Sequence, residues 1–91
     1  MKFIYTYHAQ NKFVKEKYVF QLKITKSIVQ KIVREPQFVD RSRGEKITAL
    51  AKFDANHSLV VVYTRDGDII KVITFYPIKS GGKYEGKILQ N

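Results

Sequence analysis

Residues 59–77, which read LVVVYTRDGDIIKVITFYP, predict a β-hairpin and with it the class of the fold. Two β-branched runs flank the turn residues 65–68, and Asp-Gly supplies the positive φ angles that a tight hairpin requires. Alternation along the second run predicts one sheet face made by Ile70, Val72, Thr74 and Tyr76. That face would end in the two hydroxyl groups of Thr74 and Tyr76.

The segments before the hairpin predict one strand and two helices. Residues 3–7 are aromatic and β-branched and favour a strand, and helical spacing begins at His8. Thr25 is a suitable cap for a second helix with an apolar stripe, and Pro36 predicts that this helix ends near Arg34. Residues 38–44 are expected to form a connecting loop.

The second half of the chain predicts a meander of three strands. Apolar and polar residues alternate over 46–53, residues 54–57 form a turn, and the hairpin follows. We therefore expect a single α+β domain, 1–91, with two N-terminal helices packed on one face of a small antiparallel sheet in the order β-α-α-β-β-β. Residues 80–82 are expected to be a turn and 83–91 a tail that adds an edge strand or drapes over the sheet.

Composition limits the function classes. The chain has 91 residues, 17 Lys and Arg against 8 Asp and Glu, a net charge of +9 and 44% hydrophobic residues, so a globular basic protein is expected rather than a disordered tail. It has no cysteine, which excludes disulfides and thiolate metal sites. No signal peptide, membrane span, clustered metal ligands or phosphate-binding glycine loop is recognisable, so we expect a cytoplasmic protein without metal, cofactor or membrane partner.

Basic residues interleaved with aromatic residues indicate RNA as a partner. Cations neutralise phosphates while aromatic rings stack on unpaired bases, which suits single-stranded RNA. The candidates for RNA binding are Lys12, Arg41, Lys52, Lys79, Lys83 and Tyr84. Two plainer interpretations stay open: the lysines are a solvated surface, and the rings, Tyr5 and Tyr63 above all, are core residues.

His8 is the candidate for acid–base chemistry. It lies where a strand gives way to a helix, and an imidazole titrates near pH 6.5, which suits phosphodiester cleavage. It can equally cap the helix or bind a backbone carbonyl. His57 is explained by its place in a turn.

Three segments carry a resemblance to a known family. FIYTYHA at 3–9, ITKSIVQKIVREPQFVD at 24–40 and LVVVYTRDGDIIKVITFYPIK at 59–79 resemble the small toxin-related domains of the RelE and BrnT superfamily. That superfamily belongs to the fold group of the barnase, EndoU, colicin and RelE-type RNases. The resemblance covers most of the chain, and it rests on a His-Ala pair, an Ile-Thr helix start and a Val-Ile-Thr strand.

The resemblance implies a metal-independent endoribonuclease that acts as the toxin of a toxin-antitoxin pair. His8 matches the His of the His-Ala pair, and Thr74 matches the Thr of the Val-Ile-Thr strand. Tyr76 and Arg43 are added from chemistry, with Arg43 or Lys52 as a phosphate clamp and Tyr76 or Tyr84 as proton donor or stacking group. The tail departs from typical RelE toxins, because KYEGKILQN contains no His or Arg.

Three hypotheses remain at this point. The chain is an RNase toxin, a nucleic-acid-binding module without catalysis, or a protein-interaction domain whose positive face accepts an acidic partner. An acidic antitoxin fits the first and the third, since opposite charge speeds association. The amino-acid sequence alone does not decide whether the protein is an enzyme.

Overall fold

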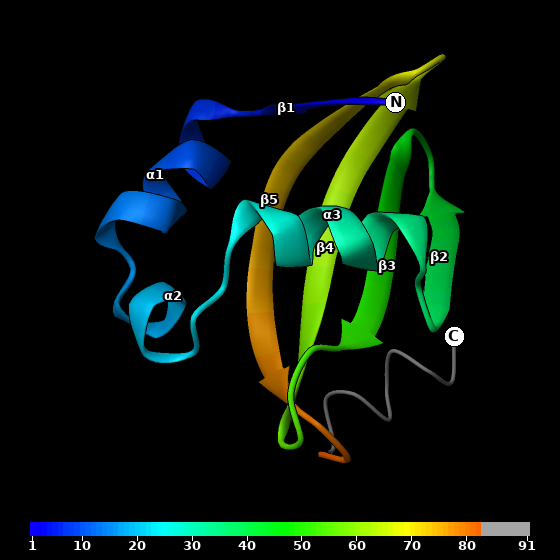
Figure 1. The fold of residues 1–91 in the computed structure, drawn as a ribbon. Coiled ribbons are helices and arrows are strands. Elements are labelled where there is room, and N and C mark those ends of the chain that lie inside the picture. Colours follow the sequence, from blue (N-terminus) through cyan, green and yellow to red (C-terminus); the bar gives the residue numbers. More distant parts are fainter. Residues whose placement is uncertain (83–91) are drawn as a thin grey trace.

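The computed structural model describes residues 1–82, and the expected tail at 83–91 lies outside them. The chain forms an α+β fold in which the helices precede most of the strands (Figure 1). The elements are, in order, β1 (Lys2–Tyr5), α1 (Tyr7–Lys15), α2 (Lys17–Gln21), α3 (Lys26–Arg34), β2 (Phe38–Arg43), β3 (Lys46–Lys52), β4 (His57–Asp66) and β5 (Ile69–Lys79).

The strands form one sheet in the order β1-β5-β4-β3-β2. The hairpin of β4 and β5 is its centre, as the sequence predicted, and Gly67 has the positive φ of 59° that the turn requires. The expected sheet was antiparallel throughout, whereas this one is mixed. β1 pairs with β5 in parallel because the helices carry the chain back across the sheet before β2 begins.

α3 packs across one face of the sheet, as expected (Figure 1). Thr25 Oγ1 accepts a hydrogen bond from the N–H of Ile28 at 3.2 Å, which caps the helix, and the helix ends at Arg34, before Pro36. The buried stripe of α3 is Val29, Ile32 and Val33. It packs against inward-facing residues of β3, β4 and β5, so the core lies between this helix and the centre of the sheet.

The first predicted helix is divided in two. Glu16 has an extended backbone conformation, with φ −82° and ψ 123°, and it separates α1 from α2. Each short helix buries one small or β-branched residue, Ala9 in α1 and Val19 in α2. Figure 1 shows both helices beside β5 rather than over the middle of the sheet.

The prediction of a loop at 38–44 was wrong. Residues Phe38–Arg43 form β2, which pairs with β3 at one edge of the sheet. The polar run Asp-Arg-Ser-Arg carried no alternating apolar pattern, because an edge strand needs only its first residues to cover the core. A register shift between Asp40 and Arg43 further disguised the strand.

A β-bulge overturns the predicted faces of β5. Val62 pairs with Thr74 but Tyr63 pairs with Val72, so Ile73 is an extra residue in the ladder. Ile70 and Val72 therefore face the helices together with Phe75, and all three are at most 1% exposed. Thr74 and Tyr76 still share a face, as predicted, but it is the face opposite Ile70 and Val72.

Candidate functional site

α1 covers the part of the β5 edge that β1 leaves unpaired. β1 reaches along β5 only as far as Val72. Beyond it, Thr6 Oγ1 donates a hydrogen bond to the carbonyl of Ile73 at 2.9 Å and accepts one from the N–H of Ala9 at 3.1 Å. One threonine thus caps α1 and fastens it to the bulge, which blunts an exposed strand edge.

Lys12 of α1 also binds the unpaired part of β5, and two hydrogen bonds fix its ammonium group there. Its Nζ donates to the carbonyl of Phe75 at 2.8 Å and to the hydroxyl of Tyr18 at 3.1 Å. The same atom lies 5.6 Å from the centroid of the Phe75 ring and 6.0 Å from that of Tyr76. An ammonium group carries three hydrogens, so two are used within the protein and one remains for a ligand.

The structure brings four of the predicted residues to this edge. His8 is exposed and precedes Lys12 by one helical turn, so the two side chains leave the same face of α1. Thr74 follows Ile73 on the unpaired part of β5, and its side chain is on the same sheet face as that of Tyr76. Tyr76 lies under Lys12. We call His8, Lys12, Tyr18, Thr74 and Tyr76 the α1–β5 cluster.

His8 is not the helix cap, because Thr6 takes that role. Within residues 1–82 the imidazole makes no hydrogen bond or ion pair, so the alternative in which it binds a carbonyl does not hold either. The His8 ring is therefore exposed to solvent, and within residues 1–82 it makes no interaction that would stabilise the fold.

The other predicted site residues lie elsewhere. Arg41 and Arg43 are exposed on β2, three strands away from β5, which is about 14 Å at the usual strand spacing. Lys52 and Lys79 are exposed near the start of β4, and Lys79 lies three residues beyond Tyr76 on β5, which is about 10 Å along the strand. Arg43 is thus too distant to act with His8 and Thr74. Lys83 and Tyr84 lie outside the described residues.

His57 is occupied by a neighbouring carboxylate. Its Nδ1 lies 3.0 Å from Asp54 Oδ1, and its ring stacks on Phe53 with centroids 6.1 Å apart. The backbone N–H of Asn56, and after it the His57 ring, hold the pKa of Asp54 below its ordinary value. Residues 1–82 contain no group of three His, Cys, Asp or Glu side chains placed to hold a metal ion.

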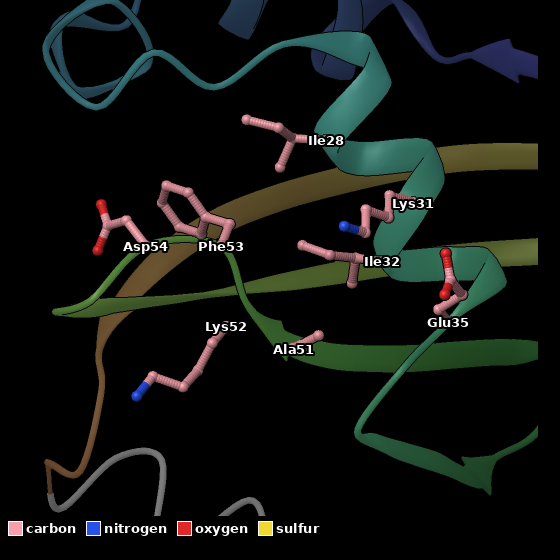
Figure 2. A pocket seen from close by; sticks show the side chains of 8 residues that line it. All are labelled: Ile28, Lys31, Ile32, Glu35, Ala51, Lys52, Phe53 and Asp54. Atoms are coloured by element: carbon pink, nitrogen blue, oxygen red, sulfur yellow. The ribbon is translucent and has the colours of Figure 1, made fainter.

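A groove opens between α3 and the end of β3 (Figure 2). Its volume is about 390 Å³, and its lining residues are Ile28, Lys31, Ile32, Glu35, Ala51, Lys52, Phe53 and Asp54. Figure 2 shows Lys52 turned away from α3, while Ile28, Ile32 and Phe53 make the apolar wall. Two cations and two carboxylates share the rim, so the groove has no net preference for an anion.

The cations of the described surface have no acidic partners. The ion pair between His57 and Asp54 is the single one among residues 1–82, and none of the lysines or arginines in that range lies within 4.0 Å of a carboxylate. Asp40, the acidic residue of β2, is held instead by the side chain and N–H of Ser42, which lower its pKa. The excess of positive charge is therefore uncompensated within the described fold.

Two residues of the cluster region were missed from the sequence. Thr6 was counted as part of the first strand, although a threonine directly before a helical spacing is a typical N-cap signal. Tyr18 was not singled out from the sequence, and the break at Glu16 that turns it toward Lys12 has no signal in the sequence.

Searches against family models, curated proteins and solved structures found no match to this chain. Among residues 1–82, no helix is both long and apolar enough to cross a lipid bilayer.

Proposed function

We propose that this protein binds single-stranded RNA and cleaves it without a metal ion at the α1–β5 cluster. The observation that carries the proposal is the Lys12 ammonium, which two hydrogen bonds hold one helical turn from an accessible histidine. A cation fixed before the substrate arrives stabilises the charge that develops on phosphate at no cost of reorganisation. The uncompensated positive charge supports a polyanionic substrate.

The chemistry follows from the groups present. His8 takes the proton of a 2′-hydroxyl, whose oxygen forms a bond to the adjacent phosphorus while the bond from phosphorus to the 5′ oxygen breaks. Lys12 uses its third N–H group to donate a hydrogen bond to a phosphate oxygen. The Tyr18 hydroxyl accepts a hydrogen bond from Lys12, and its own proton passes to the departing 5′ oxygen. This leaves His8 as an imidazolium and Tyr18 as a phenolate, and proton exchange with water returns both to their resting state. The products are a 2′,3′-cyclic phosphate and a 5′-hydroxyl.

The test is incubation of the folded protein with labelled single-stranded RNA in EDTA. We expect cleavage that survives chelation and falls about 10² to 10⁴-fold in His8→Ala, the usual contribution of a general base. His57→Ala is the matched control, because its ring is held by Asp54 at the start of β4 and is not part of the α1–β5 cluster, and it should cleave normally. Equal activity in both histidine variants would refute the assignment of His8.

Thr74→Ala and Arg43→Gln separate the cluster from the β2 edge. Thr74 belongs to the cluster, so its loss should reduce cleavage. Arg43 lies about three strand spacings away, so its loss should leave the rate of cleavage within about twofold. A large loss in Arg43→Gln alone would place the reaction at the opposite edge.

RNA binding without cleavage is the second candidate, favoured by one observation. Catalytic histidines are usually oriented by a third group, and the His8 ring has no such partner within residues 1–82. RNA that stays intact when bound by wild type would support this candidate. An acidic protein partner, such as an antitoxin, is supported by the charge alone, and tight protein binding with no affinity for RNA would identify it.

A further inference from the structure

Two cations and a glutamine form a row on α3 that leads away from the α1–β5 cluster. Lys26, Gln30 and Arg34 are spaced at four-residue intervals, so they line the side of α3 that faces β1 and α1. Each of the three contacts an aromatic residue on that side. We call them the α3 row.

The contacts of the α3 row are specific. Lys26 Nζ lies 5.0 Å from the centroid of the Tyr5 ring and 5.8 Å from that of Phe13. Gln30 Nε2 donates to the Tyr5 hydroxyl at 3.1 Å, and the Arg34 guanidinium lies 5.4 Å from the Phe3 ring centroid. Rings that attract the cations restrict their side chains without neutralising their charge.

The rings also join the α3 row to Lys12. Phe13 contacts Tyr5 with centroids 5.8 Å apart and Phe75 with centroids 4.7 Å apart. Phe75 in turn lies under Lys12, whose Nζ binds its carbonyl. Three packed rings, Tyr5, Phe13 and Phe75, therefore connect Lys26 to Lys12, and Arg34 lies over the separate ring of Phe3.

We infer that the α3 row is a second phosphate-binding site, which holds the RNA strand on one side of the nucleotide bound at the α1–β5 cluster. This inference rests on the proposed function and assigns the substrate to extended single strands rather than short fragments. Lys26 and Arg34 are separated by eight residues, or about 12 Å of helix. This distance corresponds to about three to four nucleotides of a stacked strand at roughly 3.4 Å each.

The opposite side of α3 supplies the matched control. Lys31 lies on the same helix, is exposed, and lines the groove next to Glu35. Lys46 is exposed on β3 and has no aromatic ring contact among residues 1–82. The double variants Lys26→Gln/Arg34→Gln and Lys31→Gln/Lys46→Gln therefore lose the same charge at different places.

The experiment measures affinity for a fluorescent eight-nucleotide RNA and for a dinucleotide over a series of salt concentrations, with His8→Ala as background to prevent cleavage. Loss of two counterion-releasing contacts predicts about 25-fold weaker binding of the octamer by Lys26→Gln/Arg34→Gln at 0.1 M salt, with a salt slope shallower by about 1.4. The control should lose less than about threefold, and both should bind the dinucleotide equally.

Each outcome decides one claim. Equal losses in the two double variants would overturn the α3 row while leaving RNA binding intact. Octamer binding that depends on the α3 row, without cleavage by the wild-type protein, would retain the α3 row and refute catalysis. Absence of RNA binding by the wild type would overturn both, as would preferential binding to phosphatidylserine vesicles that RNA does not displace. Circular dichroism of each variant confirms that it is folded.

Discussion

The two edges of the sheet use their polar residues in different ways. At the β5 edge, Thr6 and Lys12 of α1 bind carbonyls of a strand 63 to 67 residues away. At the β2 edge, Asp40 binds the N–H of Ser42, two residues along, and Arg41 and Arg43 extend into solvent. Hydrogen bonds between distant segments fix the position of a polar group relative to the rest of the fold before a ligand binds. Hydrogen bonds between near neighbours in the sequence fix only the conformation of their own segment.

The largest effect is expected at α3, which lies across the sheet between the two edges (Figure 1). Ile32 is 2% exposed in the core, and Ile32→Asp should unfold the protein because an unpaired charge would be buried there. Ile28 is half-buried on the groove wall, and Ile28→Asp should cost about 1 to 2 kcal/mol. Urea denaturation measures both, and equal losses would show that the groove is as well packed as the core.

The comparison of the edges is tested most directly at Thr6. Thr6→Val removes the cap of α1 and the bond to Ile73, so we expect a loss of about 2 kcal/mol from a cap and one hydrogen bond. Thr25→Val removes a cap alone, on α3, and should cost about 1 kcal/mol. If the two variants lose the same free energy of unfolding, the bond from Thr6 to the bulge contributes nothing.

The smallest effect is expected from the local bonds of Asp54. Its folded pKa is lowered, so its contribution to stability is present above its unfolded pKa of about 4 and is lost as the pH falls through the lower folded value. The N–H of Asn56 is the main cause and His57 a lesser one. NMR titration of the carboxyl carbon should therefore show that His57→Ala leaves the pKa of Asp54 still below its ordinary value. A full return to that value would make His57 the main cause.

The elements with local signals were predictable from the sequence. These signals act on neighbouring residues: Asp-Gly sets the hairpin turn, Thr25 begins α3, and Pro36 ends it. The turn and both ends of the helix lie where they were predicted. The bulge at Ile73 was not predictable, because Thr6, which binds its carbonyl, lies 67 residues away. The parallel pairing of β1 with β5 likewise joins residues that are far apart in the sequence, so it has no local signal.

The candidate site shows the same division. His8 and Lys12 were predictable as a pair, since four residues of helix place them on one face, and Thr74 and Tyr76 kept a common face despite the bulge. Arg43 was assigned by its chemistry alone, and strand order separates it from the others. Lys26 and Arg34 were not recognised because their significance depends on rings contributed by β1 and α1.

The parallel pair of β1 and β5 has a consequence for synthesis of the protein. β1 precedes β5 in the chain and therefore leaves the ribosome before it, yet β5 is its partner in the sheet. α1 likewise needs Ile73 and Phe75 to hold Thr6 and Lys12. A nascent chain therefore carries neither the α1–β5 cluster nor its attachment to the α3 row until β5 has emerged. The proposed RNA-cleaving site can therefore form only after β5 has been translated and the slow long-range pairing is complete.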